Sequence, residues 1–69
     1  MQRIMAHAII YRGRTYRMHV AELTDTGQLR LYPFDTEIHS TPFINGTITI
    51  DTIPDPHTGR PSLHILKIL

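Results

Sequence analysis

The sequence predicts an all-β domain, and two features indicate this fold class. Short runs rich in Ile, Thr and Tyr recur along the 69-residue chain, and their apolar members alternate with polar ones as in strands. Clusters of Gly, Asp, Asn and Pro separate these runs, as turns require. We therefore expect one domain over residues 1–69, an antiparallel meander that forms a small sandwich or a half-open barrel of five or six strands.

Residues 4–24 predict a β-hairpin that turns at Gly13. Alternation places four apolar side chains on one face of the first arm: Ile4, Ala6, Ala8 and Ile10. A register centred on Gly13 opposes His7 directly to His19 across the two arms. A slip of one residue removes this opposition, so the two histidines test the register.

A third strand over residues 29–34 completes the predicted meander. The turn signal at residues 25–28 combines an opening Asp with a Gly. Pro33 cannot donate a ladder hydrogen bond, so the strand ends there or lies at an edge of the sheet. Residues 35–42 are polar and end in Pro42, which predicts a loop or an irregular edge segment.

The Asn-Gly dipeptide at residues 45–46 is the strongest short hairpin signal in the chain. It either joins residues 43–44 to residues 47–53 as a hairpin or marks a bulge before that strand. Residues 47–53 alternate without a break and predict a strand that buries Ile48 and Ile50, with threonines on the other face.

The C-terminal run differs from the others because it is apolar on both faces. Residues 54–61 hold three prolines and predict an exposed loop, after which Leu63 and Ile65 share one face and Leu66 and Ile68 the other. The length of residues 62–69 and their isoleucines favour a strand over a short helix. A small sheet does not cover both faces, so we expect a homo-oligomer or a protein partner.

The composition of the chain indicates the cellular compartment in which we expect it. The chain has no Cys, no visible secretory signal and no run approaching the roughly 20 apolar residues of a membrane helix. We therefore expect a cytoplasmic protein without a membrane partner.

Two sets of residues could hold a metal ion. Asp35, Glu37 and His39 alternate and would share one side of an extended segment, and His7 with His19 forms the second set. Residues spaced by two on one strand stand about 6–7 Å apart, which is wide for one ion. The pair of His7 and His19 would need two more ligands. We therefore prefer the interpretation of both sets as solvated polar surface, and we expect no cofactor.

Tyrosines and arginines interleave in the first half of the chain, where five of the seven basic residues lie. Aromatic rings beside Arg on a small sheet can bind single-stranded nucleic acid. This alternative reading rests on seven residues: Tyr11, Arg12, Arg14, Tyr16, Arg17, Arg30 and Tyr32. A net charge of only +1 makes nucleic acid a possible partner but not the favoured one.

One stretch carries a family resemblance. Residues 32–41 read YPFDTEIHST and residues 45–48 read NGTI, after the turn at residues 25–27. This pattern resembles that of certain short uncharacterised bacterial β proteins, which are similar in turn to the small β-sandwich domain beside the catalytic barrel of amidohydrolases. The resemblance spans residues 6–50 and implies a β fold. It carries over no catalytic residue, because the chain has no barrel and no His-x-His metal pair.

The sequence holds no motif for catalysis. It has no Cys nucleophile, no Gly-x-Ser-x-Gly elbow and no phosphate-binding Gly loop. We therefore expect a non-enzymatic interaction or structural module that self-associates through its C-terminal strand or an edge strand. The alternatives are a small nucleic-acid-binding module and an accessory domain, or remnant, related to metal-dependent hydrolases.

Overall fold

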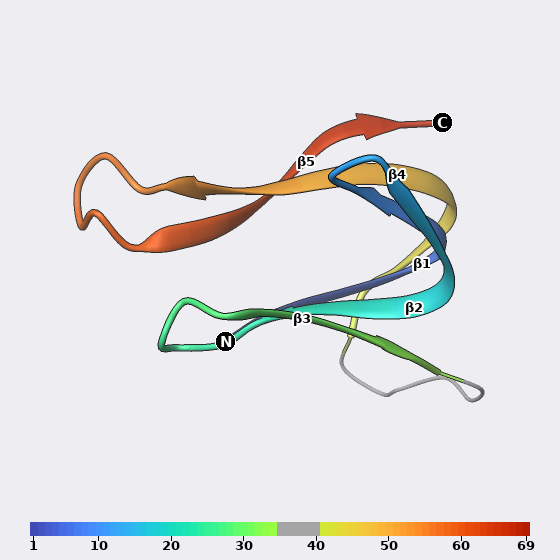
Figure 1. The fold of residues 1–69 in the computed structure, drawn as a ribbon, viewed down its shortest axis with the longest axis horizontal. Helices are drawn as coiled ribbons and strands as arrows, with labels where there is room; N and C mark the ends of the chain where they lie inside the picture. Colours follow the sequence, from blue (N-terminus) through green and yellow to red (C-terminus); the bar gives the residue numbers. More distant parts are fainter. Residues whose placement is uncertain (35–40) are drawn as a thin grey trace.

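A computed structural model describes residues 1–34 and 41–69. These residues form five strands and no helix, which confirms the all-β prediction (Figure 1). The strands join in one mixed sheet of order β3-β2-β1-β4-β5. Their bounds are β1 Gln2–Tyr11, β2 Arg14–Leu23, β3 Leu29–Pro33, β4 Phe43–Pro54 and β5 Pro61–Ile68.

The first three strands form the predicted meander, but the hairpin register differs from the prediction by one residue. Tyr11 is the partner of Arg14, so Arg12 and Gly13 alone make the turn. Both have positive φ, 51° and 79°, as a two-residue type I′ hairpin turn requires. The register centred on Gly13 is therefore wrong, and His19 lies opposite Ala6 instead of His7.

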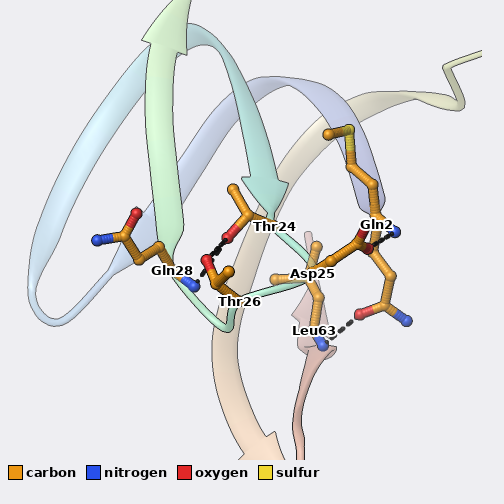
Figure 2. A network of polar contacts seen from close by, with 7 residues as sticks. Gln2, Thr24, Asp25, Thr26, Gln28 and Leu63 are labelled. Atoms are coloured by element: carbon orange, nitrogen blue, oxygen red, sulfur yellow. Dashed lines mark hydrogen bonds and ion pairs between the residues drawn. The ribbon is translucent and has the colours of Figure 1, made fainter.

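Strand β3 lies at one edge of the sheet and ends at Pro33, as predicted. The turn before it is held by the Thr24 hydroxyl, which accepts the Gln28 N–H at 3.0 Å and hydrogen-bonds the Thr26 hydroxyl at 3.0 Å. Figure 2 shows these contacts beside the first residues of β1.

Strand β4 pairs with β1 in parallel, so the expectation of a wholly antiparallel sheet is wrong. Ala6 is the partner of Ile44 and Ala8 is the partner of Thr47, which leaves two residues of β4 opposite one of β1. The Asn-Gly dipeptide at residues 45–46 fills this irregularity. It therefore marks a bulge within a continuous strand, and no hairpin forms there.

The main core cluster shows that the faces of β1 and β2 change at mid-strand. The cluster consists of Ile4, Ala6, Ile9, Ala21, Ile48 and Ile50. On β1 the cluster contains Ile4 and Ala6 and then Ile9. The predicted apolar face is therefore correct as far as Ala6 and wrong for Ala8 and Ile10. The break lies beside Met18 on β2, whose φ of 53° is positive. On β4 the alternation is regular, and the burial of Ile48 and Ile50 is confirmed.

The other side of the sheet is also packed where β1 and β2 begin to bend. Met5 and Val20 are partners and are fully buried, although alternation turns them away from Ile4 and Ala6. Phe43 is the partner of Met5 in the β1–β4 register, and its ring makes an edge contact with that of Phe34, at 6.1 Å between centroids. A chain this small thus buries apolar groups on both sides of its central strands.

The sheet curls but does not close. Figure 1 shows β1 and β2 bending so that their hairpin end lies near β4, while β3 lies in the opposite layer from β5. A Cβ on Gly27, in the turn before β3, would stand 3.1 Å from the Pro61 ring at the start of β5. The two edges of the sheet therefore approach each other at this end. Within the described residues, no helix is long and apolar enough to cross a membrane.

Candidate interaction surfaces

The C-terminal run is a strand, as predicted, and it pairs within the chain at the free edge beyond β4. Its last residue continues the ladder, because Leu69 and Thr47 exchange two backbone hydrogen bonds of 2.8 and 3.3 Å. Four aliphatic side chains are nevertheless exposed to between 39% and 69%: Ile65, Leu66, Ile68 and Leu69. The sheet leaves these apolar groups uncovered.

The outer edge of β5 is blocked over its first half. The Leu63 N–H donates to Oε1 of Gln2 at 2.8 Å, so this backbone group points away from β4 (Figure 2). Pro61, two residues earlier, has no N–H to offer. The side chain of Gln2 thus crosses the gap between the first and last strands and caps the edge of β5.

The second half of the β5 edge carries no such cap among the described contacts. Alternation in an antiparallel ladder turns the backbone groups of Ile65 outward, as it does those of Leu63. The register shifts by one residue between Ile65 and Lys67, which places the extra residue at Leu66. Counting back from the inward-bonded Leu69, the next outward groups belong to Ile68. Ile65 and Ile68 therefore turn their N–H and C=O groups away from β4, toward the outer edge of the sheet.

The opposite edge of the sheet is less suited to pairing. Strand β3 has only five residues, ends in Pro33 and carries the exposed Arg30. Short length, proline and charge are the features that keep natural edge strands from pairing with other chains. Of the two edges, β5 is the accessible one.

A polar groove of about 390 Å³ lies where the two edges approach. Its lining includes Met1, Asp25, Asp55 and Arg60. The terminal ammonium of Met1 donates to Asp25 at 2.6 Å, and this hydrogen bond, with the positive charge of the ammonium, lowers the pKa of the carboxyl group below its ordinary 3.8. Asp55 accepts the N–H groups of His57 and Thr58. Both carboxylates thus have hydrogen-bond partners within the chain.

The candidate metal ligands do not gather into a metal site where the structure describes them. His7 packs its ring against Phe43, at 5.3 Å between centroids. The Nδ1–H of His19 donates to the Arg17 carbonyl at 2.7 Å, and the ring lies beside that of Tyr16. Among the described residues, no three His, Asp or Glu side chains gather closely enough to hold an ion. The second candidate set, Asp35, Glu37 and His39, lies outside the described residues.

The seven residues of the nucleic-acid reading divide into two groups. On β3, the Tyr32 hydroxyl donates to Oε1 of Glu22 at 3.2 Å, and Arg30 lies 3.9 Å from the same carboxylate. Glu22 is 92% buried, so Tyr32 and Arg30 stabilise a buried carboxylate and are engaged within the sheet. The other five lie at the β1–β2 hairpin: Tyr11, Arg12, Arg14, Tyr16 and Arg17.

Two residues that the sequence reasoning missed belong to these surfaces. Gln2 caps β5, and no pattern in the sequence links residues 61 positions apart. Lys67 lies in one row with the hairpin, because Ile10 is the partner of Thr49 and Thr49 is the partner of Lys67. Only the strand order could reveal either relationship.

Comparison with known proteins yields no relatives. No family model, curated protein or solved structure matches this chain. The resemblance to the amidohydrolase β-sandwich domain therefore stays a prediction.

Proposed function

We propose that this chain is a cytoplasmic, non-enzymatic interaction module that forms a homodimer through the outer edge of β5. The observation that carries the proposal is the combination of an edge strand with four exposed aliphatic side chains, from Ile65 to Leu69. Apolar residues on an exposed edge are a template for pairing with another strand. The absence of Cys supports the compartment.

A second copy is the occupant that fits this edge best. Pairing there requires an extended strand with apolar side chains, and β5 is itself such a strand. The outward backbone groups at Ile65 and Ile68 also suit a two-fold axis. In an antiparallel pair centred between Leu66 and Lys67, Ile65 of each copy faces Ile68 of the partner subunit.

The Gln2 cap supports the same arrangement, because it restricts pairing to the second half of the strand. Leu63 is already hydrogen-bonded, so a partner strand meets open backbone groups only beyond it. In this arrangement the curled sheet is a half-open barrel. The side chain of Gln2 bridges its gap at Leu63, in the first half of β5, and the partner subunit extends the sheet along the second half.

Sedimentation equilibrium of the wild-type chain and two matched variants tests the proposal. Ile68→Lys places a charge in the proposed interface, while Gln28→Lys adds the same charge at an exposed position beside β3. We expect dimers for the wild type and Gln28→Lys at micromolar concentration, and monomers for Ile68→Lys. A wild-type monomer over this range, or equal association of both variants, would reject the β5 dimer.

A further inference from the structure

The end of the sheet that carries the β1–β2 hairpin is its most basic region. Arg12, Arg14 and Arg17 lie within six residues of chain and are all exposed. Strand pairing brings the exposed Lys67 to the same end. Thr15, Ile10, Thr49 and Lys67 are successive partners across β2, β1, β4 and β5. We call these four cations the basic face. It holds four of the seven Lys and Arg residues of the chain.

Part of the basic face lies on the side of the sheet opposite the core cluster. Ile9 and Ile48 are partners in that cluster, so the next residues, Ile10 and Thr49, point to the other side. Lys67 shares the row of Thr49, and Arg17 is the partner of Ala8, two residues from Ile10. The threonine hydroxyls of this side therefore stand beside cations, a combination that contacts phosphate oxygens.

Few acidic groups oppose these cations. Among the described residues, no carboxylate lies within ion-pair distance of any member of the basic face. The nearest acidic residue by strand register is Asp51, two residues beyond Thr49, and its Oδ1 accepts the Thr52 N–H at 2.8 Å. The basic face thus keeps a net positive charge although the whole chain carries only +1.

The contact between Arg12 and an aromatic ring at the turn favours nucleic acid over an acidic protein as the partner. The Arg12 guanidinium lies 5.3 Å from the centroid of the Tyr11 ring. Tyr16 packs against the core cluster, on the side of the sheet away from Arg17 and Lys67, so its ring is not part of this surface. Bases stack on aromatic and guanidinium planes, whereas carboxylates need only the charge. We infer that the basic face binds the phosphate backbone of single-stranded nucleic acid, with a base stacked on the Arg12 guanidinium at the hairpin turn.

Fluorescence anisotropy with a labelled oligouridylate tests this inference. We expect binding at low salt, with a slope of about −0.7 in log affinity against log salt for each phosphate contact. Three contacts would weaken binding by about 20-fold when the salt concentration rises fourfold. No binding at low salt would reject the inference.

Two triple variants with equal net charge separate a defined surface from overall charge. Arg12→Asn, Arg14→Gln and Arg17→Gln together should weaken binding by at least about tenfold. Arg3→Gln, Arg30→Gln and Arg60→Gln remove the same charge elsewhere and should cause a much smaller loss. Equal losses would reject the basic face. If the hairpin variant unfolds by circular dichroism, Arg17→Gln alone should still reduce the salt slope by about 0.7.

The remaining arms separate this inference from its alternatives. Polyglutamate of matched charge should bind far more weakly than oligouridylate, and equal binding would reject recognition of nucleic acid. The Ile68→Lys variant should bind oligouridylate at least as tightly as the wild type, since it removes no cation of the basic face and adds one beside Lys67. This arm makes the result independent of the proposed dimer.

Discussion

The side-chain carbonyl of Gln2 accepts the backbone N–H of Leu63 at 2.8 Å and so joins the first strand to the outer edge of the last. These strands are not neighbours in the sheet, because β4 lies between them. A single amide thus bridges the gap that the curled sheet leaves open. It also occupies a backbone donor that an exposed edge strand would otherwise offer to another chain.

Replacing this amide by an apolar side chain of similar length should expose the edge. Gln2→Met removes the acceptor and should lower the free energy of unfolding by about 0.5–1.5 kcal/mol. Gln2→Glu keeps an oxygen acceptor and serves as the control. Hydrogen exchange at the Leu63 amide should accelerate in Gln2→Met alone. Unchanged exchange at this one amide would show that the bond does not protect the edge in solution.

The hairpin turn contains a residue that is poorly suited to its backbone conformation. Arg12 has a φ of 51°, in the left-handed region that Asn and Gly tolerate better than other residues. Arg12→Asn should therefore raise the free energy of unfolding by about 0.5–1 kcal/mol, as measured by urea denaturation. Thr15→Asn, in the following strand, should bring no gain. A loss of stability in Arg12→Asn would mean that the guanidinium over the Tyr11 ring outweighs the backbone effect.

This turn also explains why the sequence predicted the hairpin but not its register. Gly13 is the recognisable turn residue, so the sequence predicts a pairing centred on it. The actual turn has two residues, and its first is an Arg, which carries no signal for positive φ. A slip of one residue then exchanges every cross-strand partner, and the expected opposition of His7 and His19 disappears.

The strand order was hidden for a different reason. Local alternation reports which residues are extended, and it predicted β3, β4 and β5 together with the burial of Ile48. It carries no information on whether β4 pairs with β3 in sequence or crosses to β1, as it does. The two surfaces depend on this crossing, because it puts β5 at an edge and brings Lys67 into one row with Ile10.

The change of face within β1 can be tested with neighbouring isoleucines. Alternation from Ile4 predicted Ile10 as the core residue, whereas Ile9 is fully buried and Ile10 only partly so. Ile9→Val should cost about 0.5–1.5 kcal/mol of stability, and Ile10→Val should cost clearly less. Urea denaturation of the two variants gives the comparison. A larger loss from Ile10→Val would restore the regular alternation and contradict the bulged register.

The close approach of Gly46 and Leu69 makes the end of β5 sensitive to a single methyl group. A Cβ on Gly46 would stand 2.6 Å from the Leu69 carbonyl oxygen, a backbone atom that is held by its bond from Thr47. Gly46→Ala should therefore displace Leu69 and cost roughly 1–3 kcal/mol, as overpacking does elsewhere. Hydrogen exchange at the Thr47 and Leu69 amides should accelerate by more than the global loss of stability explains.

Gly13→Ala is the control, because a Cβ at Gly13 meets no atom within 4 Å and its cost is conformational only. Its destabilisation should leave the Leu69 amide no more exposed than the rest of the sheet. Equal local effects of the two substitutions would mean that β5 ends before Leu69 in solution.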